Sequence, residues 1–389
     1  MKDVFITGDS IITSLGLSAE ANYQALKRGD IGIRRCSDPA LSPVPVPLSL
    51  VDTVKLEEAF AAMLCELGKE TAPGFFTRLE KMLILSVYQA TRHLQDDIKN
   101  PKILFILSTT KGNIHLLEER YKLIHDHKRI FLWELARIVK NFFGFTQEPV
   151  IVSNACISGV VAIMAGARYI RSGAYSHVVV AGGDLLSEFV IAGFQSFQSL
   201  SPGPCRPYDI SRDGLSLGEG CGAVLLSEER PANMPAVRVL EGSITNDANH
   251  ISGPSRTGEE LGLAMRTAME RSGLLPSEIS FISAHGTATS FNDEMESRAI
   301  AFAGLGKIPV NSLKGYWGHT LGAAGVIESV ASVRSLLDNT LIATAGFSEP
   351  GLPEPVNVIR ETAPTPLVSC LKTASGFGGC NAALIYKKD

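Results

Sequence analysis

The sequence has little net charge, no paired-cysteine motif and no long apolar run. Its 389 residues carry a formal net charge of −4, so no global basic field is available to attract nucleic acid. No uninterrupted apolar run reaches about 18 residues, so no membrane span is expected. Residues Met1–Gly8 predict a strand and a turn, and they lack the apolar core of a signal peptide. These absences predict a cytoplasmic protein.

Cysteine and glycine patterns exclude further classes of protein. The seven cysteines are an odd number without Cys-x-x-Cys spacing, which argues against a disulfide framework and against a zinc site. No Gly-x-Gly-x-x-Gly motif opens a helix after the first predicted strand, and no phosphate loop with Gly-Lys-Ser/Thr occurs. A nucleotide site is therefore not predicted.

What the sequence does contain is an alternation of apolar strands and helices. A hydrophobic content of 45% with 20% charged residues is typical of a globular protein. The predicted strands are Val4–Thr7, Ile103–Leu107, Val150–Ser153, Val178–Ala181, Ala223–Leu226, Val237–Glu241, Ile279–Ser283, Leu341–Thr344 and Ala382–Tyr386. The predicted helices are Arg78–Gln95, Ile157–Arg171, Thr257–Ser272 and Thr320–Asp338. We expect a layered α/β architecture with parallel sheets, divided at the polar segment Glu228–Pro235 into residues 1–229 and 230–389.

Three separate segments carry reactive side chains among small residues. They contain Cys156, His285, and the pair Lys314 and His319. A thiolate can hold an acyl group and imidazoles can stabilise an enolate, so this set fits carbon–sulfur acyl chemistry.

The predicted elements place these side chains at strand and helix ends. Cys156 lies before a predicted helix, whose dipole and free amides would stabilise a thiolate. His285 ends a predicted strand, at the sheet edge where α/β folds bind ligands, and His319 precedes a predicted helix. An isolated histidine is more often a satisfied core residue, and we apply that interpretation to His93, His115, His177 and His250.

In this order and context, the segments resemble the β-ketoacyl-acyl carrier protein synthases, condensing enzymes of the thiolase superfamily. The likeness extends to Val4–Gly8, Arg206–Asp209, Arg212–Gly220 and Gly376–Asn381. The second histidine, in place of asparagine, is typical of the elongating branch. The resemblance implies a thiolase-like five-layered αβαβα fold made of two similar halves, with two central helices between two sheets.

The resemblance also implies roles for further residues. Lys314 matches the active-site lysine of the family, and Glu328 is its expected partner because a buried ammonium without one is costly. Phe377 is expected to gate the thiol from a glycine-rich loop that includes Gly378. The backbone N–H groups of Phe377 and Cys156 are expected to form an oxyanion hole.

The implied reaction is a decarboxylative condensation. Cys156 accepts an acyl group from a carrier protein, malonyl carrier protein loses CO₂ while His285 and His319 stabilise the enolate, and the carbanion attacks the acyl group. Neither a metal nor an organic cofactor is needed. Short segments between Leu200 and Arg206 and over residues 37–77 favour a specialised polyene, polyketide or unusual lipid pathway at least as much as fatty acid synthesis.

Two alternatives stay open at this level. The first is a thiolase or a hydrolytic acyltransferase, for which Cys380 is the candidate second cysteine. The second is a non-catalytic subunit of the chain-length-factor type, although such subunits usually lack the nucleophile that Cys156 supplies.

The implied partner is an acidic acyl carrier protein that brings acyl and malonyl groups. The docking candidates are the basic residues Arg78, Lys81, Lys128 and Arg129. The strand Val178–Ala181 resembles the dimer edge of the family, so a homodimer, or a heterodimer with a related subunit, is expected.

Overall fold

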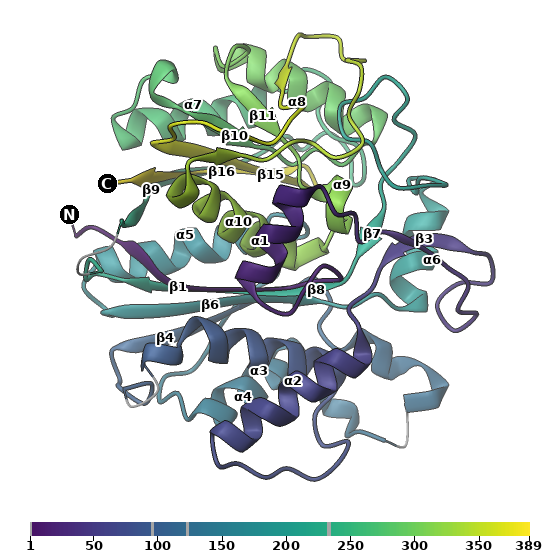
Figure 1. The fold of residues 1–389 in the computed structure, drawn as a ribbon, viewed down its shortest axis with the longest axis vertical. Coiled ribbons are helices and arrows are strands. Elements are labelled where there is room, and N and C mark those ends of the chain that lie inside the picture. The colour runs from purple at the N-terminus through teal and green to yellow at the C-terminus, as the bar shows by residue number, and fades with distance from the viewer. Residues whose placement is uncertain (1, 95–96, 122–123, 232–234) are drawn as a thin grey trace.

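A computed structural model describes residues 2–94, 97–121, 124–231 and 235–389, which form five αβαβα layers (Figure 1). One outer layer holds α2 (Thr53–Glu66), α3 (Arg78–Ala90) and α4 (Leu132–Phe143), and the other holds α7 (Glu259–Ser272) and α8 (Ser290–Phe302). The central layer holds α1 (Ala19–Arg28), α5 (Ser158–Arg171) and α10 (Ala324–Asp338). The predicted five-layered thiolase-like architecture is confirmed.

The two sheet layers have the same topology. The N-terminal layer has the order β5-β4-β6-β8-β1, and the C-terminal layer has the order β11-β10-β15-β16-β9 with β13 at its edge. The strands are β1 (Phe5–Ile12), β4 (Ile103–Ser108), β5 (Val150–Val152), β6 (His177–Asp184), β8 (Gly220–Ser227), β9 (Val237–Asn246), β10 (Phe281–Ser283), β11 (Pro309–Asn311), β13 (Asn357–Val358), β15 (Ser369–Gly376) and β16 (Cys380–Lys388). Matching strand orders confirm the expectation of two similar halves.

Each layer is mixed, so the expectation of parallel sheets is wrong in part. The first three strands of each layer run parallel, and the remaining pairings are antiparallel. The antiparallel strands are β8 beside β6 and β16 beside β15, and the buried, uniformly apolar character of these strands does not distinguish the two directions. The structure also contains the helices α6 (Glu188–Ser196) and α9 (Lys314–Trp317). One small sheet is formed by β2 (Arg34–Cys36), β3 (Val46–Ser49) and β7 (Leu217–Gly218). A second small sheet is formed by β12 (Thr340–Leu341) and β14 (Ala363–Pro364).

The two central helices are in backbone contact, which joins the halves beneath the site. A Cβ atom on Gly159 would lie 2.6 Å from the Val326 nitrogen, and one on Gly325 would lie 2.4 Å from the Val160 nitrogen. Only glycine allows this approach, because those separations are shorter than real Cβ contacts. Any larger residue would push α5 and α10 apart and displace the residues at their N-terminal ends.

Two strand predictions are corrected by the structure. Val178–Ala181 lies inside β6, which has β4 and β8 as neighbours, so the edge strand of this layer is β5. Only Leu341 of the predicted strand Leu341–Thr344 is in a strand, β12. The Asn311 amide donates to the carbonyl of residue 342 at 2.9 Å, so a side chain takes the place of a neighbouring strand there.

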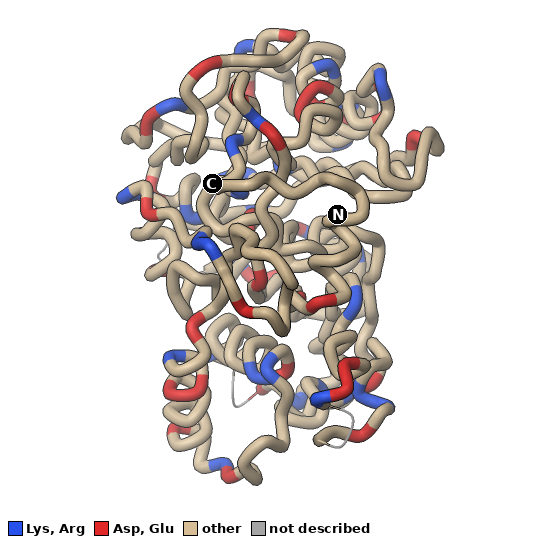
Figure 2. Tube along the Cα trace, turned by 90° about the vertical axis from the view of Figure 1, so that its right-hand side faces the viewer, with Lys and Arg blue, Asp and Glu red and all other residues tan. Residues whose placement is uncertain are grey.

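Several boundaries lie at or outside the described residues. Gln95, the last residue of the predicted helix Arg78–Gln95, is not described, and α3 ends at Ala90. Residues 232–234 of the predicted seam are also not described, and the division between residues 229 and 230 stays a prediction. Within the described ranges, no helix is long and apolar enough to cross a membrane. Basic and acidic residues are interspersed along the trace (Figure 2).

Candidate active site

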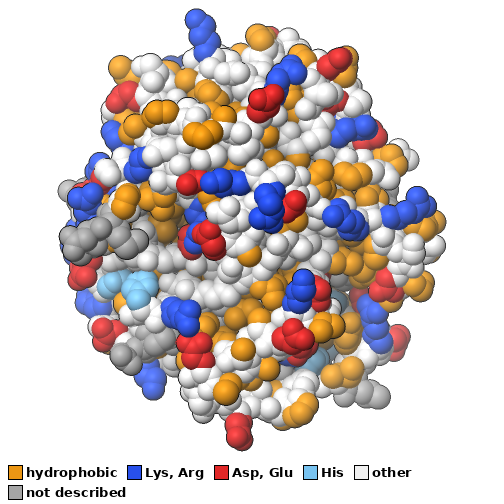
Figure 3. Space-filling model, in the orientation of Figure 1, with side chains coloured by type: hydrophobic (Ala, Val, Ile, Leu, Met, Phe, Trp, Pro, Cys, Tyr) orange, Lys and Arg blue, Asp and Glu red, His pale blue; other side chains and the backbone are white. Residues whose placement is uncertain are grey.

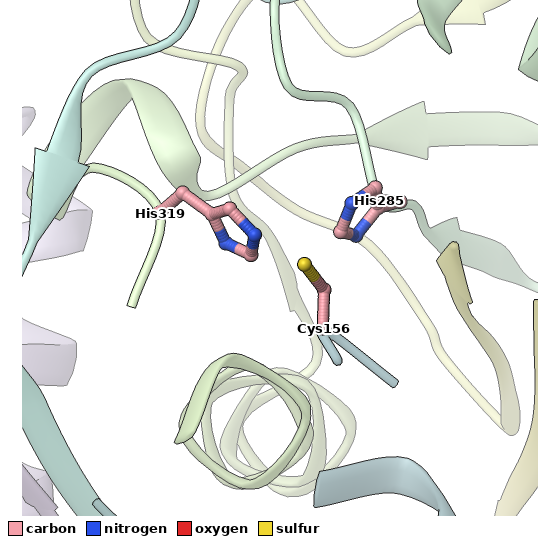
Figure 4. Close-up of side chains that lie close together, drawn as sticks. All are labelled: Cys156, His285 and His319. Atoms are coloured by element: carbon pink, nitrogen blue, oxygen red, sulfur yellow. The ribbon is translucent and has the colours of Figure 1, made fainter. Parts of the chain in front are cut away.

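Cys156 lies in a sharp turn between β5 and α5. Ala155 has a φ of 44°, in the left-handed region where a side chain is strained. The Ser158 hydroxyl holds the turn, because it accepts the N–H of Asn154 at 2.8 Å and donates to the carbonyl of Ala155 at 2.6 Å. The turn carries the Cys156 sulfur to a position between two imidazole rings (Figure 4).

Those rings belong to His285 and His319, which come from the second half of the chain. The sulfur of Cys156 and one nitrogen of each ring all lie within 4.8 Å of one another. The ring centroids are 5.3 Å apart and the ring planes are perpendicular, at 89°. His285 follows β10 and His319 follows α9, beyond the neighbouring parallel strand β11, so adjacent strand ends bring them together. A structural zinc site needs four ligands, so this cluster alone does not form one.

A buried ion cluster lies behind His285. The Lys314 ammonium is 2.6 Å from one carboxylate oxygen of Glu328, as the resemblance implied, and the Lys372 ammonium is 2.7 Å from the other. Burial opposes the charge of Glu328, yet the two ammonium groups hold the pKa of its carboxyl below the usual value. Lys314 Nζ also donates to the carbonyl of His285 at 2.6 Å. One carboxylate therefore bridges two buried lysines next to a site histidine.

A second buried carboxylate fixes the backbone of the same histidine. Glu296 of α8 accepts the N–H groups of His285 at 2.6 Å and of Gly286 at 2.7 Å. It also accepts the hydroxyl of Tyr208 at 2.8 Å and that of Thr373 at 3.0 Å. Four donors satisfy both oxygens, so the loop after β10 is held rigidly.

Both imidazoles are neutral at pH 7. Burial, followed by the charge of Lys314, lowers the pKa of His285 and that of His319 well below the usual value for histidine. Among the described residues, neither ring nitrogen of His319 has a hydrogen-bond partner. Buried polar atoms are rarely left unpaired, so these nitrogens are free to bind a substrate group.

Burial works against a thiolate at Cys156, so the thiolate stays a prediction. Burial raises the pKa of Cys156 to about 11, and the nearby Lys314 charge only partly opposes this. The helix N-terminus is present as predicted, but desolvation of the sulfur dominates. Deprotonation of Cys156 therefore needs an acceptor in the site, and a neutral imidazole can supply it.

An entrance cavity of about 480 Å³ leads to the three side chains. Phe377 lies at its mouth, 36% exposed, with its ring centroid 5.7 Å from that of Phe194 and 5.4 Å from that of Phe197. The backbone of Phe377 is the smallest of the influences on the pKa of the Cys156 thiol, and it acts to lower that pKa. Gly378 has a φ of 85° with nothing within 4 Å of the place for a Cβ, so glycine is needed there for its backbone conformation.

Three of the four docking candidates have internal ion-pair partners. Arg78 pairs with Glu219, Lys81 with Glu57 at 2.7 Å, and Arg129 with Glu80 at 2.9 Å. Lys128 is exposed and has no ion pair among the described residues. The face in Figure 3 likewise shows basic side chains beside acidic ones. A docking role for these residues stays a prediction.

Sequence reasoning missed several residues of the site. Lys372 is a lone charge in the apolar strand β15, and Glu296 follows Asp293 by one helical turn on the buried face of α8, so both left a signal. His250 and His93 are exposed, which corrects their assignment to the core, and His250 lines the entrance cavity. Its ring nitrogen accepts the N–H of residue 252 at 3.2 Å, an interaction within one loop that periodicity does not reveal.

Comparisons with known proteins agree with this geometry. The family described as "Beta-ketoacyl synthase, N-terminal domain" matches residues 127–232, and "Beta-ketoacyl synthase, C-terminal domain" matches residues 237–348. A 3-oxoacyl-[acyl-carrier-protein] synthase 2 of Staphylococcus aureus is 32% identical over 100% of this chain and 98% of its own length. A mitochondrial 3-oxoacyl-[acyl-carrier-protein] synthase of Arabidopsis thaliana is also 32% identical, over 99% of this chain and 93% of its own.

Solved structures give the same result. A ketosynthase in complex with its chain length factor from Xenorhabdus doucetiae is 25% identical with a TM-score of 0.86, covering 100% of this chain and 98% of that one. The ishigamide ketosynthase/chain length factor has a TM-score of 0.88 at 24% identity, covers 99% of each chain, and shows the fold alone.

Proposed function

Because the chain belongs to the β-ketoacyl synthase family and is a condensing acyltransferase, we propose that Cys156 accepts the acyl group and that His285 and His319 stabilise the malonyl enolate. The observation that carries this assignment is the cluster of one thiol and two neutral imidazoles within 4.8 Å. The product is a β-ketoacyl thioester that is two carbons longer than the acyl group loaded on the enzyme.

In the first half-reaction the Cys156 sulfur attacks the thioester carbonyl of an acyl carrier protein. Its proton passes to a neutral imidazole and then to the leaving thiolate of the carrier, so one carbon–sulfur bond forms as another breaks. The N–H groups of Phe377 and Cys156 stabilise the oxyanion of the tetrahedral intermediate. Phe377 lines the same cavity as Cys156, which supports this role.

In the second half-reaction malonyl carrier protein occupies the entrance cavity. Loss of CO₂ leaves an enolate, whose oxygen accepts hydrogen bonds from His285 and His319, and its carbon attacks the acyl group on Cys156. The carbon–sulfur bond to Cys156 breaks as the carbon–carbon bond forms, and the released thiolate takes up a proton. Burial, and then the charge of Lys314, keeps both imidazoles neutral, and Lys314 also donates to the carbonyl of His285. A buried lysine with Glu328 as its partner fits a positioning role.

The partners are part of the same proposal. An acyl carrier protein brings both substrates, and Lys128 is the basic candidate whose charge is least compensated, ahead of Arg78, Lys81 and Arg129. A second copy or a related subunit pairs along the edge strand β5, which is only half-buried in the single chain. The Xenorhabdus doucetiae ketosynthase assembles with a chain length factor, which favours a specialised pathway with such a subunit here. All seven cysteines are free, which supports a place in the cytoplasm.

The test is acyl loading of the purified enzyme from acyl carrier protein, followed by intact mass. The wild type and Cys221→Ala, whose thiol is buried in β8, should both gain one acyl group. Cys156→Ala should gain none and should lose condensation. An acyl adduct that persists on Cys156→Ala would overturn the assignment, and absence of any adduct on the wild type would favour the non-catalytic subunit.

A further inference from the structure

The segment 109–111 runs beside the residues that lead to Cys156. The N–H of Thr109 donates to the carbonyl of Val152 at 3.3 Å, and the Ser153 hydroxyl donates to the carbonyl of Thr110 at 3.5 Å. Gly322 closes the other side, because a Cβ on it would lie 2.8 Å from the Thr110 nitrogen. The segment is thus enclosed between the turn of Cys156 and the loop that follows His319.

A buried carboxylate fixes this segment. Asp184, at the end of β6, accepts the Thr109 hydroxyl at 2.8 Å and the N–H groups of Thr110 at 3.0 Å, Lys111 at 3.3 Å and Gly322 at 2.8 Å. Asp184 is 2% exposed, so these bonds form away from water. The backbone that carries the Lys111 side chain is therefore preorganised.

The Lys111 side chain carries a charge that forms no ion pair among the described residues, although it partly opposes the rise that burial causes in the pKa of Asp184. Its Nζ bonds the Thr110 hydroxyl at 3.2 Å, and the ion pairs among the described residues do not include it. By contrast, the ammonium groups of Lys314 and Lys372 share Glu328. Lys111 is half-buried, so its charge is not fully solvated either.

The hydrogen bonds of residues 109 and 110 to residues 152 and 153 place Lys111 beside the segment that leads to Cys156. Burial is the main cause of the pKa shifts of Cys156 and His319, and the charge of Lys111 contributes to both. Lys111 is not among the residues that line the entrance cavity. Under the proposed function the carrier arm enters through that cavity, and the acyl chain on Cys156 extends past the sulfur towards the segments that include residues 109–111.

We propose that Lys111 is a specificity-determining residue, which selects acyl groups bearing a carboxylate beyond the thioester over hydrocarbon acyl groups of the same size. This inference rests on the proposed function of Cys156. A hydrocarbon chain beside an unpaired, half-buried ammonium would remove its remaining water without replacing the lost hydrogen bonds. A carboxylate would replace them with a charge-assisted bond.

The experiment measures loading rates on Cys156 by intact mass. Carrier protein is loaded with succinyl, glutaryl or adipoyl groups, and each is compared with the isostere in which isopropyl replaces the terminal carboxylate. At the best-fitting length, the wild type and Lys111→Arg should prefer the carboxylate by about tenfold or more, the size expected of a charge-assisted hydrogen bond. Lys111→Met should lose this preference, and Lys55→Met, an exposed lysine on α2, should retain it.

The outcomes separate this inference from the proposed function. A wild type that prefers the isopropyl isostere at every length overturns the role of Lys111, whatever the variants do. An unchanged preference in a folded Lys111→Met, or in Lys111→Gln if the first variant is unstable, also overturns it. Failure of all acyl groups to load on Cys156 contradicts the proposed function instead.

Discussion

The two site histidines are equally deep but held in opposite ways. His285 is 4% exposed and His319 is 1% exposed. His285 is bonded through its N–H to Glu296 and through its carbonyl to Lys314, whose Nζ also lies 3.4 Å from its Nδ1. The backbone of His319 bonds only to Ser216 and to residue 218, and its ring has no partner among the residues that the structure describes.

This difference fixes the position of the ring proton in His285 but not in His319. An ammonium beside Nδ1 of His285 favours a lone pair on that nitrogen, which leaves the ring proton on Nε2. The proton of His319 has no such constraint, so its ring can accept the proton of Cys156 and later donate to an enolate. A rigidly held His285 and a His319 ring with unpaired nitrogens suit a site that performs two half-reactions with the same side chains.

The largest effect should come from breaking the ion cluster behind His285. Glu328→Gln leaves the ammonium groups of Lys314 and Lys372 buried without a carboxylate, so the free energy of unfolding should fall by about 3–5 kcal/mol. Urea unfolding measures it. Glu294→Gln, which removes a half-exposed partner of Arg212, is the control and should cost less than about 1 kcal/mol. Equal decreases in the free energy of unfolding of the two variants would show that the buried cluster stabilises the fold no more than a surface ion pair does.

The next effect concerns the histidines themselves. His285→Ala and His319→Ala should each lower malonyl decarboxylation by about 10²–10³-fold, since each removes one enolate donor. Acyl loading of Cys156 should persist in His285→Ala and should be slower in His319→Ala, which loses the acceptor of the Cys156 proton. The decarboxylation rate is followed by CO₂ release, and His93→Ala, an exposed histidine, is the control. If either variant decarboxylates malonyl carrier protein at the wild-type rate, the replaced histidine does not stabilise the enolate and has a structural role.

Sequence reasoning found the three side chains of the cluster and the Lys314–Glu328 pair, and it missed Lys372 and Glu296. Cys156, His285 and His319 stand in short segments of small residues, so local context and family resemblance were enough to predict that they meet. Lys372 and Glu296 lie inside a strand and a helix, where a charge is conspicuous but its partner is not. Their partners, such as Glu328, come from other layers, and single-chain periodicity contains no information about which layers touch.

The same limit explains the errors in the fold. Residues 178–181 of β6 are buried and apolar, which predicts an interior or an edge strand equally well, so the sequence did not show that this strand lies inside its layer. The environment of the Cys156 thiol shows a related limit. A helix N-terminus is visible in sequence, whereas the depth of the Cys156 sulfur, which raises its pKa to about 11, depends on both halves of the chain.

The smallest effect is a pH dependence that should distinguish buried from exposed histidines. Burial, and then the charge of Lys314, lowers the pKa of His319 in the folded protein, while the unfolded imidazole titrates near its usual value of about 6.5. The unfolded state therefore binds more protons below that pH, and the stabilising contribution of a neutral His319 is present above about 6.5 and lost as the pH falls. At pH 5 the loss should be about 2 kcal/mol for a ring that stays neutral.

His319→Asn should therefore lose less stability than the wild type between pH 7 and pH 5 in urea unfolding. His93→Asn, which changes an exposed histidine, should follow the wild type. Part of the slope should survive in His319→Asn, because burial also lowers the pKa of His115 to about 4 and that of His285 well below its usual value. An unchanged slope in His319→Asn would mean that its ring takes up a proton in the folded state, and the contrast between an open and a fixed neutral imidazole would fail.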